Sequence, residues 1–456
     1  MTFVSAAPEP KNHIKTLMRI GYDFNSAVAD ILDNSITAAS TEININVKFN
    51  EIDAVLFIKD NGQGMTKDQL LENMKVSCKD PDESRDIGDL GRFGSGMKTA
   101  SFSHARKLTV ISKNPKSKIC SACWDVDEIE TSNAWNLEVL SDKKITDELN
   151  RIDTKLSDKG TILIWDNITM FRSNDHVEMH DQINSKLFEL KQYLSLHFHK
   201  FMKGKNKIKF FVQGDQLKPQ DPFLSSHDGS ITLGEDNPLV DGKKVSIKLH
   251  ILPHHDYLTS EELDSMGGVD EMYRKQGLYV YRSNRLIIAG GWMNLSRSFQ
   301  LAKLARVEID IPASLDKAWS TDVKKMTLQL PAKIRNKLKE LIKQPIKKSK
   351  KEYEYRGKTE EVNAYWDVNE NEKTNQIRYL IDNKNEQLKD IFLDIQDKTT
   401  QKKLKKFLNE LAKSLPLNNI YEKMSNDPKK VDQNNAVFDL DMDAILKERL
   451  EAMKNG

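Results

Sequence analysis

Three short segments within the first hundred residues carry side chains that could bind a nucleotide. The first is SAVADILDNSITAA, residues 26–39. Wound as a helix, it places Asp30 and Asn34 four residues apart and therefore side by side. Asp33 and Thr37 belong to the same polar stripe. A carboxylate and an amide oxygen at one point suit a hydrated magnesium ion, which takes one or two protein oxygens along with phosphate oxygens. By itself, such a stripe is more often a solvated helix face.

The second segment is FIKDNGQGM, residues 57–65, in which an apolar strand ends at Asp60 and is followed by Gly62 and Gly64. Glycine lets the backbone approach a planar ligand closely. The carboxylate can accept a hydrogen bond from an exocyclic amino group. The pattern therefore fits a base-binding turn, and it fits an ordinary turn after a strand equally well.

The third segment is GDLGRFGSGMKTA, residues 88–100, where Gly91, Gly94 and Gly96 precede a helical pattern that contains Lys98. Backbone N–H groups at the start of a helix, together with the positive end of its dipole, bind phosphate oxygens. The segment lacks GxxxxGK(S/T), and its glycines do not follow the first strand of a βαβ unit. It is therefore neither a Walker loop nor a dinucleotide-binding fingerprint.

The elements around these segments predict an α+β protein. Helical and strand patterns alternate from residue 14 to about 170, which indicates an α/β domain. A helical pattern near residues 182–201 opens a second region, 171–330, that continues as strands. From 331 to 456 the composition shifts to Lys, Glu, Asn and Gln with helical periodicity. The strand-like runs are INVKF, AVLFIKD, KLTVIS, GTILIWD, KIKFFV, VSIKLHIL, LYVYRSNRLIIAG and ARVEIDIP.

Charge and length restrict the class of protein. The chain has 456 residues, enough for roughly three domains. Its 70 basic and 68 acidic side chains give a net charge of +2, so the overall field argues for neither nucleic acid nor membrane. Residues 331–360 are the exception, with 11 Lys and Arg against 4 Glu. A solvated helical face explains this basic segment better than a nucleic-acid patch does.

The three cysteines, Cys78, Cys120 and Cys123, are too few for a disulfide framework and fit a reducing compartment. Cys120 and Cys123 form a single CxxC, which is weak support for zinc without a second ligand pair. The amino terminus lacks a basic start followed by an apolar run, and no apolar stretch reaches about 18 residues. We therefore expect a cytoplasmic protein with no membrane association.

The three segments, followed by Gly160 and Thr161 at the start of an apolar strand, together resemble the GHKL superfamily of gyrases, heat-shock chaperones, histidine kinases and MutL. The motifs ADILDNSITAA, KDNGQGM, GRFGSGMKTASF and KGTILIWDNI look most like the MORC type and its bacterial stand-alone relatives. This resemblance implies a Bergerat-type α/β sandwich that binds ATP over residues 1–170. QGLYVYRSNRLI and ARVEIDIPASLDKAWSTDVKKMTLQLP look like the β-α-β transducer domain, here 171–330, followed by a mainly helical C-terminal region.

The resemblance also implies roles for particular residues. Asn34 would bind Mg²⁺, and Asp60 would read the adenine with help from Thr161. A lid of about residues 78–97 would cover the phosphates. The implied ATP contacts are Asn34, Asp60, Gly62, Gly64, Met65, Gly91, Arg92, Phe93, Gly94, Ser95, Gly96, Met97, Lys98 and Thr161.

The resemblance implies two catalytic residues, a general base and a lysine. The family usually has glutamate four residues before the asparagine, whereas this chain has Asp30. A shorter carboxylate can still activate water, so we expect a slow ATPase. The resemblance also implies a transducer lysine that reaches the γ-phosphate, for which we predict Lys325, with Lys324 as the alternative.

The resemblance implies an ATP-gated machine. ATP and Mg²⁺ would order the lid and drive dimerisation of two chains, which would act on DNA or in a bacterial defence system. The alternative is a scaffold that binds ATP without hydrolysis and presents its C-terminal helices to a partner protein. A histidine kinase is disfavoured because only about a dozen residues precede His13. A general chaperone is disfavoured because too little chain follows residue 330.

Overall fold

The computed structural model of the chain describes residues 8–19, 21–49, 54–76, 96–171, 176–295, 302–315, 330–346, 365–371, 376–417 and 420. The chain divides into two compact units. The first consists of Met1–Ser298 with Lys303–Pro345, and the second of Phe299–Ala302 with Ile346–Gly456. The first unit contains two large sheets, which confirms the expected mixed α and β composition.

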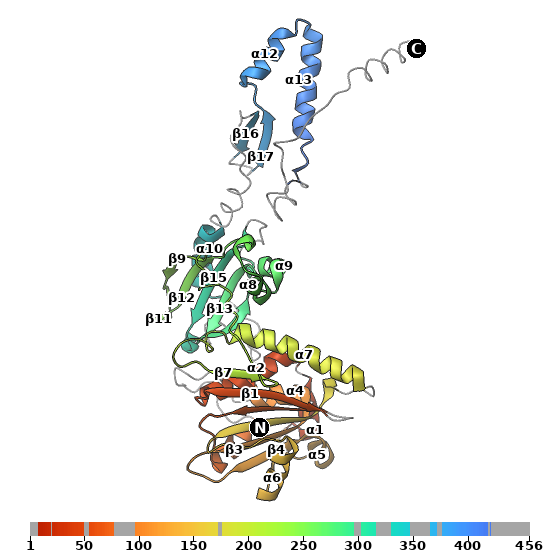
Figure 1. The fold of residues 1–456 in the computed structure, drawn as a ribbon, viewed down its shortest axis with the longest axis vertical. Coiled ribbons are helices and arrows are strands. Elements are labelled where there is room, and N and C mark those ends of the chain that lie inside the picture. Colours follow the sequence, from red (N-terminus) through yellow and green to blue (C-terminus); the bar gives the residue numbers. More distant parts are fainter. Residues whose placement is uncertain are drawn as a thin grey trace, which may run out of the picture. The chain divides into compact units, whose positions relative to one another are not determined.

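An eight-stranded sheet forms the base of the first unit, in the order β5-β4-β3-β6-β2-β1-β7-β8 (Figure 1). Neighbouring strands are antiparallel except β1 and β7, which are parallel. All four strands predicted before residue 170 are present, and β7 and β8 join the same sheet from beyond that point. The strands are β1 (Glu42–Phe49), β2 (Ala54–Asp60), β3 (Ala105–Lys113), β4 (Cys120–Asp125), β5 (Glu138–Val139), β6 (Gly160–Ile168), β7 (Lys209–Val212) and β8 (Asp215–Gln216).

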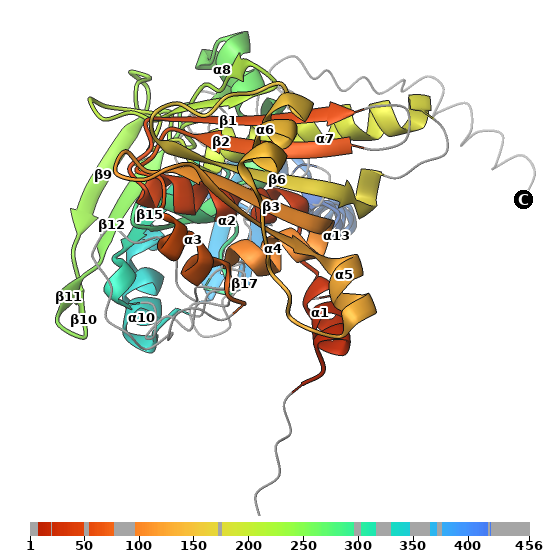
Figure 2. The same cartoon turned by 90° about the horizontal axis from the view of Figure 1, so that it is seen from below.

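Helices cover both faces of this sheet because successive strand residues point to opposite sides. In β6, Leu163 and Trp165 belong to the main core with α2, whereas Ile162 and Ile164 pack with Ile145 of α6 on the other face. Figure 2 shows α2 and α4 side by side along the strands. The helices are α1 (Pro10–Met18), α2 (Phe24–Thr37), α3 (Lys67–Met74), α4 (Gly96–His104), α5 (Val126–Ser132), α6 (Asp142–Arg151) and α7 (His176–His197).

A five-stranded sheet in the order β14-β13-β15-β12-β9 forms the rest of the first unit. Its strands come from the runs predicted at residues 245–252, 278–290 and 305–312, together with β9, which was not predicted. β13 and β14 form a hairpin, and β13 pairs in parallel with β15. The elements are β9 (Ile231–Asp236), β10 (Leu239–Val240), β11 (Lys243–Lys244), β12 (Ser246–Ile251), α8 (Ser260–Ser265), α9 (Gly268–Arg274), β13 (Gly277–Arg282), β14 (Arg285–Ala289), β15 (Ala305–Ile311) and α10 (Ala332–Leu341).

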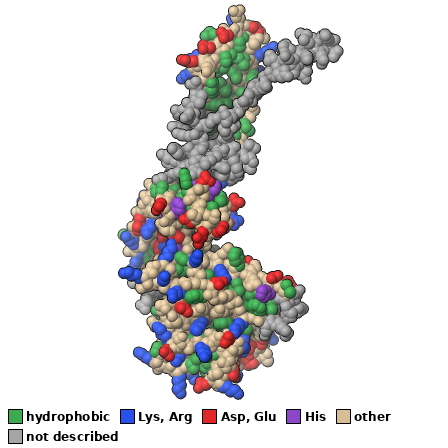
Figure 3. Space-filling view, viewed as in Figure 1, with side chains coloured by type: hydrophobic (Ala, Val, Ile, Leu, Met, Phe, Trp, Pro, Cys, Tyr) green, Lys and Arg blue, Asp and Glu red, His purple; other side chains and the backbone are tan. Residues whose placement is uncertain are grey.

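The described part of the basic segment, residues 331–346, contains the amphipathic helix α10. Ile334 and Leu338 are fully buried, one helical turn apart. Lys333, Arg335 and Lys339 are exposed on the other side. Figure 3 shows basic and acidic side chains intermixed on the visible face of the first unit, as expected for a net charge near zero.

The second unit pairs β16 (Trp366–Asn371) with β17 (Gln376–Ile381) and continues into α12 (Glu386–Asp394) and α13 (Lys398–Lys413). The hairpin was not predicted from the sequence. Among the side chains described from residue 365 onward none is buried, and Leu393 and Phe407 are 78% and 64% exposed. Across the described residues of the whole chain, no helix is long and apolar enough to cross a bilayer.

Candidate nucleotide-binding site

Helix α2 carries the first predicted segment and is more deeply buried than a surface helix. It begins after Asp23, whose side chain accepts a hydrogen bond from the Ser26 N–H and caps the helix. Asp30 and Asp33 are buried, at 6% and 1% exposure, while Asn34 is exposed. The polar stripe is therefore only partly solvated, because its two carboxylates lie away from water while Asn34 and Thr37 are exposed.

Asp30 and Asn34 lie together, as their spacing predicted. Asn34 Nδ2 donates to the Asp30 carbonyl over 3.2 Å, which orients the amide and leaves Oδ1 as its acceptor for a cation. The Tyr22 hydroxyl donates to Asp30 Oδ2 over 3.0 Å. A Cβ added to Gly96 would lie 4.0 Å from that same oxygen. The start of α4 is therefore beside the Asp30 carboxylate, and these hard oxygen donors fit a magnesium ion.

Asp60 lies at the end of β2 in a dense set of hydrogen bonds. Its Oδ2 accepts from the Ser35 hydroxyl and its Oδ1 from the Gly62 N–H, both over 2.9 Å. Burial raises the pKa of the Asp60 carboxyl above its ordinary value, although these hydrogen bonds act in the opposite direction. Because Ser35 belongs to α2, this hydrogen bond joins the helix that carries Asn34 to the turn that follows Asp60, and the two form one continuous site.

Thr161 lies opposite Asp60 in the β2–β6 pairing. Its Oγ1 is 2.9 Å from Ser112 Oγ on the neighbouring strand β3. Ser112 Oγ also accepts a hydrogen bond from the Met65 N–H over 2.9 Å. Met65 and Thr161 are thus joined to Asp60 through strand pairing and one serine that the sequence analysis did not single out.

Residues 22–161 match the family model described as histidine kinase-, DNA gyrase B- and HSP90-like ATPase. The match supports the GHKL superfamily. It covers Asp30, Asn34, Asp60 and Thr161, and it includes every strand from β1 to β5. No curated protein matches the chain.

The glycine-rich segment of this GHKL-type domain is described only from Gly96 onward. Lys98 is buried at 2% exposure, and its Nζ donates to the Asn73 carbonyl at the end of α3 over 2.7 Å. An ammonium group carries three N–H donors, so this hydrogen bond does not by itself preclude a phosphate contact, and the role of Lys98 stays a prediction. Met97 packs against the main core. The residues predicted for the site that lie outside the described ones are Gly91, Arg92, Phe93, Gly94, Ser95, Lys324 and Lys325.

Three residues of the site were missed at the sequence level: Tyr22, Ser35 and Ser112. The sequence analysis placed Ser35 on the apolar side of the helix. That position could have identified it, because a buried hydroxyl needs a hydrogen-bond partner. Tyr22 and Ser112 had no such signal. Their contacts to Asp30 and Thr161 depend on how the chain turns into α2 and on the pairing of β3 with β6.

Cys120 and Cys123 of the GHKL-type domain do not form a metal site together. They are three residues apart on β4, so their side chains point to opposite faces of the sheet. Burial raises the pKa of both thiols, to about 11 for Cys123. Because the thiolate is the form that binds zinc, the structure supports the incidental interpretation of this CxxC.

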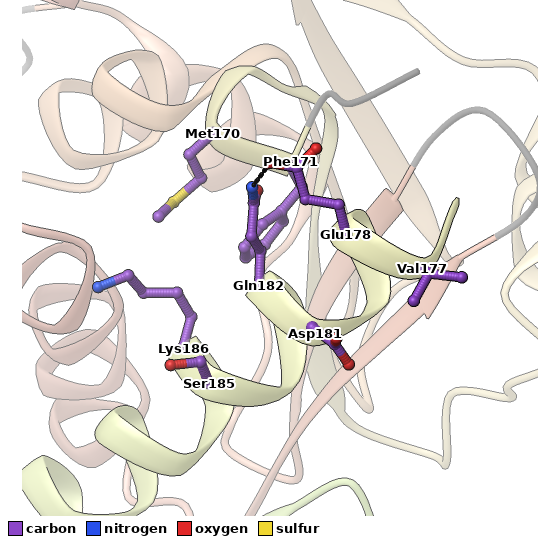
Figure 4. Close-up of a pocket in the computed structure, with 8 residues that line it drawn as sticks. All are labelled: Met170, Phe171, Val177, Glu178, Asp181, Gln182, Ser185 and Lys186. Carbon is purple, nitrogen blue, oxygen red and sulfur yellow. Dashed lines mark hydrogen bonds between the residues drawn. The ribbon is translucent and has the colours of Figure 1, made fainter. Parts of the chain in front are cut away.

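A pocket of about 690 Å³ opens between α7 and the short 3-10 turn Thr169–Phe171 (Figure 4). Gln182 Nε2 donates to Glu178 on its rim, and Lys186 is paired with Glu189. None of the predicted nucleotide contacts lines it, so it is separate from the GHKL site. Its lining residues are Met170, Phe171, Val177, Glu178, Asp181, Gln182, Ser185 and Lys186.

Because burial raises the pKa of Asp60, we predict that removing its charge keeps or raises the stability of the fold but weakens nucleotide binding. The folded-state pKa lies above the unfolded value, so the native state holds more protons between the two, and stability falls as pH rises through that window. Asp60→Asn removes the free-energy cost of holding an ionised carboxylate in a buried position. We therefore expect the unfolding temperature of this variant at pH 7.5 to equal or exceed that of the wild type. Its affinity for a fluorescent ATP analogue should fall about 10- to 100-fold, because a charged acceptor is lost.

The control for Asp60→Asn is Asp158→Asn, which removes a fully exposed carboxylate in the same domain. This control should change neither the unfolding temperature nor the affinity. If Asp60→Asn binds the analogue with wild-type affinity, the prediction that Asp60 accepts a hydrogen bond from the adenine is wrong.

Proposed function

We propose that the chain binds ATP with Mg²⁺ at α2 and the β2 turn, and that it hydrolyses ATP slowly. The match of residues 22–161 to GHKL-type ATPases supports nucleotide binding. The observation that carries hydrolysis is the Asp30 carboxylate, held by the Tyr22 hydroxyl beside Asn34 and Gly96. A buried carboxylate oriented in this way is a suitable general base.

Each residue would have a distinct task in this reaction. Mg²⁺, held by Asn34 Oδ1 and phosphate oxygens, would neutralise charge on the phosphates. Asp30 would orient the attacking water and take its proton. Asp60 would accept a hydrogen bond from the adenine amino group, with Thr161 and Met65 beside the base. Lys325, or Lys324, would stabilise charge on the γ-phosphate, as the sequence resemblance implies.

We further propose that nucleotide binding closes the lid and drives dimerisation, after which the dimer acts on DNA or in a bacterial defence system. This part follows from the MORC-like motifs. The exposed Lys333, Arg335 and Lys339 of α10 would supply contacts to DNA phosphates. Affinity for duplex DNA that is absent, or that does not weaken as salt rises, would contradict the DNA part.

The test is phosphate release with Mg²⁺ and with EDTA, together with the molar mass in solution before and after addition of a non-hydrolysable ATP analogue. We expect turnover that requires Mg²⁺ and a doubling of mass with the analogue. Analogue binding without turnover or dimerisation would instead identify an ATP-sensing scaffold that presents its C-terminal helices to a partner. Absence of nucleotide binding would refute the proposed function altogether.

A further inference from the structure

The turn between β13 and β14 places a buried arginine against the helix of the nucleotide site. Arg285 Nε donates to Asp33 Oδ1 over 2.8 Å, across 252 positions of sequence. The two side chains are only 5% and 2% exposed. The guanidinium also lies 4.4 Å from the centre of the Phe198 ring. The five-stranded sheet is thereby joined to α2 by a desolvated ion pair.

The surroundings of this pair fix the strand that carries Arg285. His197 at the end of α7 stacks on Tyr193 with ring centres 3.9 Å apart. Its Nδ1 lies 2.7 Å from the carbonyl oxygen of Leu286, the residue after Arg285. Burial, and then the charge of Arg285, lower the pKa of His197 to about 3. His197 is therefore neutral at physiological pH, and it donates this hydrogen bond without adding positive charge beside the guanidinium.

The position of Asp33 on α2 lets its ion pair with Arg285 restrain the orientation of the whole helix. It is adjacent to Asn34 in sequence and three residues after Asp30, so a rotation of the helix that released Asp33 would move both. Only small displacements are needed to matter, because a misplacement of about 1 Å in a reacting group can cost about 100-fold in rate. A desolvated charge pair resists such displacement, since separating its partners would lose the attraction that offsets the cost of their burial.

We propose that Arg285 is a positioning residue for ATP hydrolysis, acting through Asp33 to hold α2 in the orientation that aligns Asp30 and Asn34. The inference rests on the proposed ATPase function and adds to it a role for the five-stranded sheet.

The experiment must separate positioning from simple anchoring, because removing one partner alone would destabilise the fold. The informative variant is the double substitution Asp33→Leu with Arg285→Met in the full chain. Replacing a buried ion pair with apolar side chains of similar volume often leaves stability unchanged or raises it. The control is Arg151→Met with Asp166→Leu, an ion pair whose side chains are more exposed, at 39% and 11%. That ion pair has Nη1 and Oδ1 2.7 Å apart and lies between α6 and β6, on the sheet face opposite α2.

For the Asp33/Arg285 double variant we expect an unchanged unfolding temperature and an ATP-analogue affinity within about threefold of the wild type. Its kcat should fall about 100-fold, whereas the control pair should keep wild-type kcat. A folded, nucleotide-binding double variant with kcat within about twofold of the wild type would overturn the inference while leaving the proposed function intact. A wild type that binds no nucleotide would overturn both.

If the double variant does not fold, the kcat of the single variant Arg285→Lys tests whether Arg285 is a positioning residue. This substitution keeps the charge but not the planar, directed donor. A lower kcat with unchanged affinity and unfolding temperature would support positioning. An unchanged kcat would show that only charge balance is needed and would overturn it.

Discussion

Replacing Asp30 with asparagine is expected to slow phosphate release by at least about 100-fold while the affinity for ATP changes little. General bases typically contribute about 10²- to 10⁴-fold. An asparagine cannot accept the proton from the attacking water, yet its amide oxygen can still accept the Tyr22 hydroxyl that now binds Asp30 Oδ2. The packing and the nucleotide contacts are therefore kept. The measurement is single-turnover phosphate release at saturating Mg-ATP, with affinity determined separately by titration.

Two further variants serve as controls for Asp30→Asn. Tyr22→Phe removes only the hydroxyl that orients the carboxylate, so a smaller decrease in rate is expected. Asn34→Ala removes the amide oxygen and should weaken binding of the nucleotide specifically in the presence of Mg²⁺. If Asp30→Asn retains wild-type turnover, another group activates the water and the base lies elsewhere.

Replacing Gly64 with alanine is expected to lower the unfolding temperature of the N-terminal domain by about 6–12 °C. The backbone of Gly64 has φ +64°, and an added Cβ would overlap the carbonyl oxygen of Lys113 on β3. Left-handed strain costs about 1–2 kcal/mol, and overpacking adds about 1–3 kcal/mol. A total of about 3 kcal/mol corresponds to that temperature change for a domain of this size. The measurement is thermal unfolding followed by far-UV circular dichroism.

The matched control for Gly64→Ala is Gly204→Ala. Gly204 has φ +85° in the turn between α7 and β7, but an added Cβ would meet no atom within 4 Å. It therefore shares the backbone conformation without the overlap, and its loss should be limited to about 1–2 kcal/mol. Equal effects at the two positions would show that β3 moves to accept the methyl group, and that the turn after Asp60 is not held tightly against that strand.

The sequence by itself determined five strands of the eight-stranded sheet, β1, β2, β3, β6 and β7, and the nucleotide motifs, whereas β4, β5 and β8 were not predicted. AVLFIKD has the bounds of β2, and the helix predicted over residues 26–39 overlaps α2 for most of its length. These predictions succeed because they rest on local spacing: an apolar run makes a strand, and residues four apart meet on a helix. For the same reason, the spacing of Asp30 and Asn34 was enough to pair their side chains.

Only the tertiary structure decided what surrounds those motifs. The stripe of α2 reads as polar, yet Asp33 is buried because Arg285 reaches it from a strand 252 positions away. Ser35 reads as part of an apolar face, yet it donates to Asp60 because α2 crosses the end of β2. Periodicity reports only neighbours within a few residues, whereas these contacts depend on which elements the folded chain brings together. The motifs of the site follow from local sequence, and the partners that orient them follow from packing.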